Sequence, residues 1–256
     1  MNVLEQIVAN KRREVEAVKQ SFSIDCFRES EHFNRETLSL SDAITKAVFG
    51  IIAEIKRKSP SGGDIKLGLD VAEQAAFYEH NGASGISILT DKDYFGGSLN
   101  DIATARRVAH LPLLRKEFII DEIQLYEAKA AGADAVLLIG AILQSQEATY
   151  LTNVARNLGL EVLYEVHTAE EVGFIPAEVD LVAVNNRDLK AQQTTLQHSF
   201  DLIKILPKHI PAISASGIRT TEDIDALKAA GFKGALIGES ILREGHLAEL
   251  VKHLRS

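Results

Sequence analysis

The chain has 256 residues, of which 46% are hydrophobic and 25% are charged, as is typical of a globular protein. This length suits one large α/β domain or two small ones, and it is enough to bury a sizeable core. The net charge of −8 disfavours nonspecific binding to nucleic acid or to an anionic membrane, because both require a basic surface.

The N-terminal segment has the pattern of an amphipathic helix. In MNVLEQIVANKRREVEAVKQ the apolar residues recur at helical spacing: Leu4, Ile7, Val8, Val15 and Val18. The segment lacks the apolar region of a secretory signal. No run in the chain approaches the roughly 18 to 20 apolar residues that span a membrane. Cys26 is the only cysteine, which excludes an internal disulfide. We therefore expect a cytoplasmic protein whose residues 1–45 form a helical extension.

Eight short apolar runs with strand-forming residues follow, beginning about 20 to 35 residues apart. They cover residues 50–56, 85–90, 111–118, 134–140, 160–167, 180–186, 211–217 and 234–240. Most intervals between them hold a segment of helical period, such as DEIQLYEAKAAGA or TTEDIDALKAAGF.

Three of these helix-to-strand junctions repeat one pattern. In NGASGISIL, AGADAVLLI and AGFKGALIG, a glycine suited to a left-handed helix cap (Gly82, Gly132, Gly231) shortly precedes a strand. Apolar strands that alternate with helices indicate a covered parallel sheet. We predict a single (β/α)8 TIM barrel domain over residues 46–256, with the helical extension before it. The alternative is an open doubly wound sheet, but neither GxGxxG nor GxxxxGK[ST] follows the first strand.

Polar residues gather where the predicted strands end, which is where such barrels carry their active sites. They are Glu54, Lys56, Lys116, Glu165, Asn185 and Arg187. Strand alternation places Lys116 on the face of Leu114, Glu165 on the face of Leu163 and Asn185 on the face of Ala183. Any one of them could be a charge that reaches solvent. A group of two lysines and two glutamates favours acid–base catalysis, because buried charges require partners.

The last two strands end in glycines followed by predicted helix starts. SASGIRTTED has Gly217, with Thr220 or Thr221 as N-cap, and GALIGESILRE has Gly238. Such glycines let a phosphate approach backbone N–H groups, although either alone could be a turn glycine.

The remaining candidate residues give weaker evidence of function. The eight histidines show no metal-ligand spacing, so no metal site is expected, and His167 is interpreted as a polar loop residue. Phe95 and Phe118 could form an aromatic wall or pack within loops.

Several segments together closely resemble the indole-3-glycerol-phosphate synthase family of tryptophan biosynthesis. They include IVANKRREV, IIAEIKRKSPSGGDI, ISILTDKDYFGGSLNDI, LPLLRKEFIIDEIQ, EVLYEVHTAEE, AVNNRDLK, SASGIRTTEDI and ALIGESILR. These stretches run in the family's order from near residue 7 to near residue 243. The resemblance implies a monofunctional carboxy-lyase that closes the indole ring of 1-(2-carboxyphenylamino)-1-deoxyribulose 5-phosphate and releases carbon dioxide and water. It implies no cofactor, and we expect a monomer.

The resemblance also implies roles for individual residues. Lys116 matches the general acid on the substrate carbonyl, Glu165 the general base, and Lys56 a lysine near the substrate carboxylate, with Glu54 beside it. The remaining matches orient the substrate, bind its phosphate or form the apolar pocket: Asn185, Arg187, Ser59, Ser216, Gly217, Gly238, Glu239, Phe95, Phe118, Leu137 and Leu189. The stretch SPSGG after the first strand is expected to form a flexible loop able to close over the substrate.

One position departs from the family. The usual SESG at the end of the seventh strand is SASG here, with Ala215 in place of the glutamate, and the chain has no tryptophan. Ala215 keeps open a noncatalytic barrel that binds a phosphorylated metabolite. A phosphoribosylanthranilate isomerase is a further alternative, but no strand end carries the cysteine that its acid–base pair requires.

Overall fold

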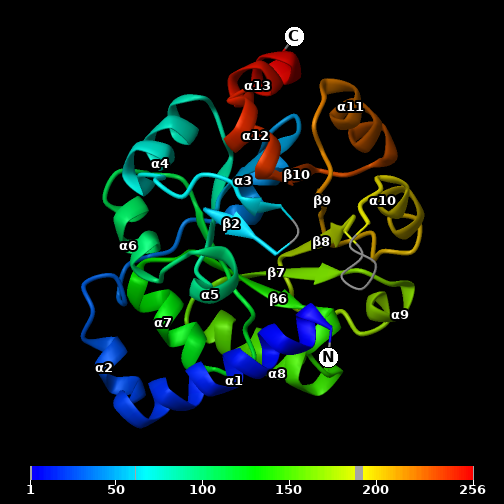
Figure 1. Cartoon of the computed structure of the whole chain (residues 1–256). Helices are drawn as coiled ribbons and strands as arrows, with labels where there is room; N and C mark the ends of the chain where they lie inside the picture. Colours follow the sequence, from blue (N-terminus) through cyan, green and yellow to red (C-terminus); the bar gives the residue numbers. More distant parts are fainter. Residues whose placement is uncertain (1, 61, 188–192, 256) are drawn as a thin grey trace.

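The computed structural model describes residues 2–60, 62–187 and 193–255. Strands and helices alternate along most of this chain (Figure 1). In chain order the elements are α1 (Val3–Ser21), α2 (Ile24–Arg28), α3 (Leu40–Lys46), β1 (Gly50–Ile55), β2 (Lys58–Ser59), β3 (Gly63–Asp64), α4 (Val71–His80), β4 (Gly85–Leu89), α5 (Lys92–Phe95), α6 (Asn100–Arg106), β5 (Leu113–Lys116), α7 (Ile123–Ala131), β6 (Ala135–Ile139), the 3-10 helix η1 (Gly140–Ile142), α8 (Ser145–Asn157), β7 (Glu161–Val166), α9 (Ala169–Val172), β8 (Leu181–Asn185), α10 (Gln197–Leu202), β9 (Ala212–Ala215), α11 (Thr221–Ala230), β10 (Gly234–Ile237), α12 (Glu239–Glu244) and α13 (Leu247–Arg255).

Eight parallel strands close into a barrel in the order β1-β10-β9-β8-β7-β6-β5-β4. β1 closes the ring, because it pairs with β10 through Gly50↔Gly234 and with β4 through Ile52↔Gly85. The outer helices surround this ring (Figure 1). The predicted (β/α)8 barrel with a preceding helical segment is therefore confirmed. The left-handed glycines are confirmed as well, with φ of 82° at Gly82, 95° at Gly132 and 105° at Gly231.

Strand alternation divides the apolar residues between two clusters. Ile51, Ala53 and Ile55 face outward into the layer between the barrel and its helices. Ile52 faces inward and packs in the barrel interior with Leu114, Leu163, Ala183 and other residues. Both faces of β1 are buried, which explains why its sequence is almost continuously apolar.

Helix α3 fills the N-terminal end of the barrel. Leu40 and Ile44 are completely buried in the interior cluster. The glycines that begin β1 and β4 make room for them. A Cβ at Gly50 would lie 2.5 Å from Ile44 Cδ1, and one at Gly85 would lie 2.6 Å from Leu40 Cδ1. The barrel is thus plugged at this end, which leaves the opposite end for a site.

The N-terminal extension packs against the barrel wall, where α1 lies beside α7 (Figure 1). The expected helix buries Ile7 and Val15, and it also buries Lys11. Further along, the carboxylate of Asp134 accepts hydrogen bonds from Arg35 Nη2 at 2.6 Å and from the Leu38 N–H at 2.9 Å. Among the described residues, no helix has both the length and the apolar character needed to cross a membrane.

All eight strands end one to three residues before the predicted runs do, and β5, β9 and β10 differ most. β5 ends at Lys116 rather than at Phe118, because the Glu117 carboxylate accepts the Phe118 N–H at 2.9 Å and the chain turns there. β10 ends at Ile237, and α12 begins two residues later at Glu239. In the loop after β1, Lys58–Ser59 and Gly63–Asp64 pair as a short antiparallel hairpin. The closing motion expected of this loop stays a prediction.

Candidate active site

A cavity of about 690 Å³ opens at the C-terminal end of the barrel. Every candidate residue within the described ranges lines it: Glu54, Lys56, Ser59, Phe95, Lys116, Phe118, Leu137, Glu165, Asn185, Arg187, Ser216, Gly217, Gly238 and Glu239. Leu189 lies outside the described residues. The structure therefore brings together residues that are up to 185 positions apart, from Glu54 to Glu239.

A carboxylate between two lysines forms one wall of the cavity. Glu54 Oε1 lies 2.7 Å from Lys56 Nζ, and Glu54 Oε2 lies 3.0 Å from Lys116 Nζ. Glu54 is buried at 3% exposure, and Lys116 is mostly buried. Burial by itself would raise the pKa of Glu54, but the two ammonium groups outweigh it and lower the pKa to about 2. Burial would likewise lower the pKa of Lys116, but Glu54 and Glu165 raise it. Both lysines are therefore held near an ionised carboxylate.

Glu165 presents a second carboxylate from β7. Its Oε1 accepts a hydrogen bond from Asn185 Nδ2 at 3.0 Å, which links β7 to β8. Its Oε2 is buried and has no hydrogen-bond partner among the described residues. An unpartnered buried carboxylate oxygen is well suited to accept a proton from a bound molecule.

His167 follows β7, which ends at Val166, so it is a loop residue as the sequence analysis interpreted it. It is nevertheless buried, and its ring lies between two carboxylates beside the cavity. Nε2 is 3.4 Å from Glu165 Oε1, and Nδ1 is 3.5 Å from Glu171 Oε2. Burial would lower the pKa of His167, but the nearby carboxylates of Glu171 and Glu165 raise it.

Aromatic and aliphatic side chains form another part of the cavity wall. The rings of Phe95 and Phe118 are tilted by 35° with centroids 6.0 Å apart, and Leu137 also lines the cavity. Phe95 and Phe118 therefore form the aromatic wall and are not merely packed within their loops. A flat apolar group would fit beside these rings.

The loops that follow β9 and β10 line the part of the cavity that holds Ser216, Gly217 and Gly238. Ser216 and Gly217 both have left-handed φ, at 69° and 78°. Ser216 is the only such nonglycine among the described residues. The buried Asn186 fixes this turn, because its Nδ2 donates to Ser216 O at 3.0 Å and to Ser214 Oγ at 2.9 Å.

Gly238 approaches the charged wall closely. A Cβ at Gly238 would lie 2.4 Å from Glu54 Oε1, so a glycine is required where the backbone passes the carboxylate. Arg243 from α12 pairs with Glu239 at 3.0 Å and donates to Gly62 O at 3.2 Å, which joins this end to the loop after β1.

Ala215, the departure from the family pattern, is completely buried on the inward face of β9. Its register partner on β8 is Asn185. No group of three or more potential metal ligands occurs among the described residues.

Comparisons with known proteins agree with these observations. Residues 4–254 match the family model described as indole-3-glycerol phosphate synthase. The indole-3-glycerol phosphate synthase of Bacteroides thetaiotaomicron is 44% identical over 252 residues, which are 98% of this chain and 97% of the relative. That of Carboxydothermus hydrogenoformans is 42% identical, with 94% of each chain covered.

Among solved structures, a mutant tryptophan synthase alpha-subunit from Pyrococcus furiosus aligns with a TM-score of 0.59 at 16% identity. The alignment covers 80% of this chain and 97% of that one, and at this identity it shows the fold alone. The full-length family match is the more specific result. The chain belongs to the indole-3-glycerol phosphate synthase family and is thus a carboxy-lyase of tryptophan biosynthesis.

Proposed function

We propose that this cavity converts 1-(2-carboxyphenylamino)-1-deoxyribulose 5-phosphate into indole-3-glycerol phosphate, carbon dioxide and water. The observation that carries the proposal is the arrangement of Glu54 between Lys56 and Lys116, which faces the same cavity as Glu165. This arrangement supplies protonated acids and a separate base without a metal.

The substrate has three parts that match three regions of the cavity. Its aromatic ring would lie against Phe95, Phe118 and Leu137, with Leu189 as a further candidate. Its phosphate would bind the backbone near Gly217 and Gly238, whose N–H groups are not covered by a side chain of their own. Its carboxylate would lie near Lys56, because an acidic protein must gather cations to hold an anion.

The remaining polar residues orient the substrate between these regions. Asn185 holds Glu165 and accepts the backbone N–H of Arg187 at 3.1 Å, so it fixes the Glu165 side chain and the Arg187 backbone relative to β8. Ser59 is buried at the entrance, with its hydroxyl accepting the Gly62 N–H at 2.9 Å. Ser216 and the backbone of Glu239 are the remaining groups at the end of the cavity that would bind the phosphate.

The chemistry follows from these positions. The ring carbon that bears the carboxylate attacks the substrate carbonyl carbon while Lys116 donates a proton to the carbonyl oxygen. Carbon dioxide then leaves, and its bonding electrons restore the aromatic ring. The new hydroxyl departs as water after a second protonation, for which Lys56 is the nearest further acid, and Glu165 removes a proton to complete the indole. One proton is consumed overall, because the substrate carboxylate leaves as neutral carbon dioxide.

A turnover assay tests the function directly. Indole fluorescence should rise when the protein is mixed with the anilino-ribulose phosphate in the presence of a chelator. Binding of the substrate with no fluorescence at high protein concentration would favour the alternative of a noncatalytic, metabolite-binding barrel, which Ala215 motivates.

Two substitutions test the assigned roles. Lys116→Ala and Glu165→Gln should each lower turnover by about a hundredfold or more, on the usual scale of general acid–base catalysis, with circular dichroism unchanged. Near-normal turnover in either variant would show that the corresponding role is wrong.

We also propose that the chain works in the cytoplasm as a monomer with a single domain. The extension is joined to the barrel by buried contacts, such as those of Leu40 and Ile44 in the barrel interior. All proposed site residues come from one chain. Light scattering should therefore give a mass near 28.0 kDa, and a dimer mass would contradict the monomer.

A further inference from the structure

Lys11 is a buried lysine on the extension that the proposed chemistry does not use. It lies on α1 four residues after Ile7 and four before Val15, so the helix presents it to the barrel with these apolar residues. Only 3% of the residue is exposed. An ammonium group in such a position requires several anionic partners.

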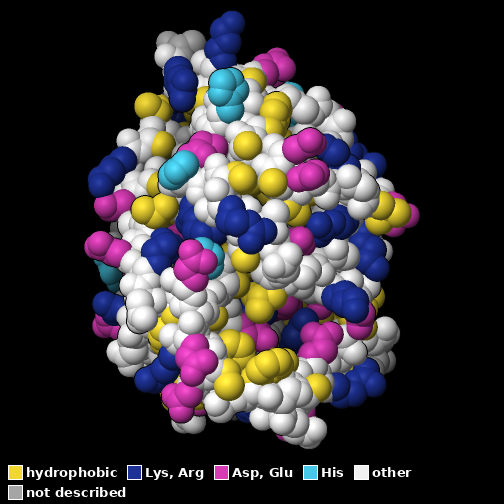
Figure 2. All heavy atoms as spheres, turned by 90° about the vertical axis from the view of Figure 1, so that its left-hand side faces the viewer, with side chains coloured by type: hydrophobic (Ala, Val, Ile, Leu, Met, Phe, Trp, Pro, Cys, Tyr) yellow, Lys and Arg dark blue, Asp and Glu magenta, His cyan; other side chains and the backbone are white. Residues whose placement is uncertain are grey.

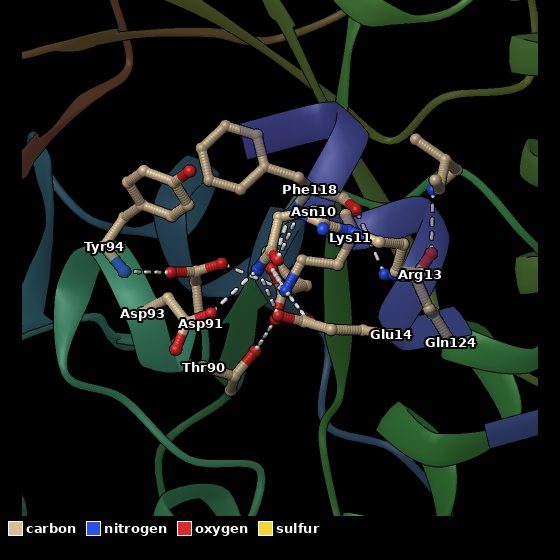
Figure 3. Close-up of polar contacts among 12 residues, drawn as sticks. Asn10, Lys11, Arg13, Glu14, Thr90, Asp91, Asp93, Tyr94, Phe118 and Gln124 are labelled. Atoms are coloured by element: carbon tan, nitrogen blue, oxygen red, sulfur yellow. Dashed lines mark hydrogen bonds and ion pairs between the residues drawn. The ribbon is translucent and has the colours of Figure 1, made fainter. Parts of the chain in front are cut away.

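Three carboxylates surround this ammonium group (Figure 3). Lys11 Nζ lies 2.6 Å from Glu14 Oε2, 3.0 Å from Asp91 Oδ2 and 3.0 Å from Glu117 Oε1. Glu14 is on the same helix, but Asp91 and Glu117 belong to the barrel and are buried at 0% and 3% exposure. Burial would lower the pKa of Lys11, but Glu117 and the other two carboxylates raise it. Lys11 therefore joins α1 to two barrel loops through buried charges.

Glu117 holds the loop that follows β5. It comes directly after Lys116, and its Oε1 accepts the Phe118 N–H at 2.9 Å while its Oε2 accepts the Thr90 hydroxyl at 2.8 Å. On the other side, Gln124 Nε2 donates to Phe118 O at 3.0 Å. Both backbone groups of Phe118 are thus fixed, and Lys11 neutralises the carboxylate that fixes the first.

Asp91 holds the loop that follows β4. Its Oδ1 accepts the Tyr94 N–H at 2.8 Å and so caps α5, the short helix that ends at Phe95. Asn10 adds a second link from α1, because its Nδ2 donates to Asp93 Oδ2 at 2.9 Å (Figure 3). The two loops carry one phenylalanine each, and Lys11 pairs with both of the carboxylates that hold them.

We propose that Lys11 is a positioning residue for the reaction, which sets the spacing of Phe95 and Phe118 and the direction of Lys116 by pairing with Asp91 and Glu117. The inference rests on the proposed function, in which the two rings form the pocket for the substrate's aromatic part. Loss of the ammonium group removes the cation that Asp91 and Glu117 share, while Arg115 Nη2 stays 3.9 Å from Glu117 Oε2, and the repulsion between the two carboxylates separates the loops that carry the rings. A displacement of this kind at a positioned group can lower catalytic efficiency by up to about a hundredfold.

Lys11→Met tests this role, because methionine keeps a long apolar side chain and removes the charge. We expect KM for the anilino-ribulose phosphate to rise about fivefold or more, with a smaller fall in kcat, under conditions in which circular dichroism shows the variant to be folded. Lys19→Met is the matched control: Lys19 is on the same helix and pairs with Asp121, but its side chain is 42% exposed, so kinetics should not change. A Lys11→Met variant with a lower Tm but normal KM and kcat would overturn the proposal in favour of a purely structural contact.

A double-mutant cycle with Phe118→Leu identifies the route of the effect. If Lys11 acts through the aromatic wall, Lys11→Met should raise KM much less in the Phe118→Leu background than in the original protein. If Lys11→Met raises KM by the same factor in both backgrounds, the effect does not pass through the aromatic wall. If Lys11→Met does not fold, Asp91→Asn is used as the test variant. Its amide oxygen can still cap α5, while the charge facing Lys11 is lost. An unchanged KM in Asp91→Asn overturns the proposal. Absence of turnover in the unsubstituted protein would instead contradict the proposed function.

Discussion

Replacing Glu54 by glutamine tests whether the carboxylate between the two lysines organises the charges of the cavity. Glutamine keeps the size of the side chain and some of its hydrogen bonds but removes the negative charge. Lys56 and Lys116 then lose the anion that lies 2.7 and 3.0 Å from them. Breaking a buried ion pair from one side is strongly destabilising, because the remaining charges stay buried without compensation.

The pKa of Glu54 gives the size of the effect. Burial would raise this pKa, but the two lysines lower it from 4.5 to about 2. At about 1.4 kcal/mol per pKa unit, the ionised carboxylate stabilises the folded state by ~3 kcal/mol. Because the pKa is lower in the folded than in the unfolded chain, this stabilisation is fully present above pH 4.5 and is lost as the pH falls toward 2.

Urea unfolding of the original protein and Glu54→Gln, from about pH 7 to about pH 3, measures this contribution. The free energies of unfolding should differ by ~3 kcal/mol at neutral pH and converge as the pH falls. Turnover should also fall by about a hundredfold or more, and its alkaline limb should move to lower pH, because Glu54 raises the pKa of Lys116.

The control is Asp42→Asn, which removes an exposed helical ion pair with Lys46 and should change stability by less than about 0.5 kcal/mol at any pH. A stability difference between the original protein and Glu54→Gln that does not vary with pH would refute the reasoning. So would full activity of the variant.

Three further substitutions probe other parts of the cavity. Gly238→Ala should lower kcat/KM by about tenfold or more, because its Cβ would lie 2.4 Å from Glu54 Oε1. Gly68→Ala, with no atom within 4 Å of the added Cβ, should leave activity unchanged, and equal kinetics in both variants would contradict the expected displacement. Ala215→Glu should change the pH profile of turnover more than the free energy of unfolding, because its side chain would enter the inward face beside Asn185; a large loss of stability with an unchanged profile would show that the interior has repacked. His167→Asn should destabilise the protein most at acidic pH: the pKa of His167 is raised in the folded state, so its contribution is present below its unfolded pKa and is lost as the pH rises through the folded value. Urea unfolding at several pH values checks this, and a stability difference that grows with pH would contradict it.

Individual residues that line the cavity were identifiable from sequence because strand alternation is local. Glu54 follows Ile52 by two positions, as Glu165 follows Leu163, so each pair shares the inward face. Strand alternation cannot say which groups meet across the barrel. The contact of Glu54 with Lys116 joins residues 62 positions apart, and only barrel closure sets that distance.

The N-terminal extension illustrates the same division. The helical spacing of Ile7 and Val15 predicted a buried face, and Lys11 lies between them on that face. Its partners Asp91 and Glu117 are loop residues with no periodicity of their own. Nothing local in the sequence pairs them with α1.

The amino-acid sequence by itself determined the repeated strand–helix unit, the polar strand ends and the glycine turns, because each depends on side-chain pattern and backbone freedom within a few residues. Tertiary structure alone decided that Glu54 lies between two lysines, that Asn185 holds Glu165 and that Lys11 neutralises two buried loop carboxylates. Charges interact through space over a few ångströms, and closure of the barrel is what brings such distant positions within that range.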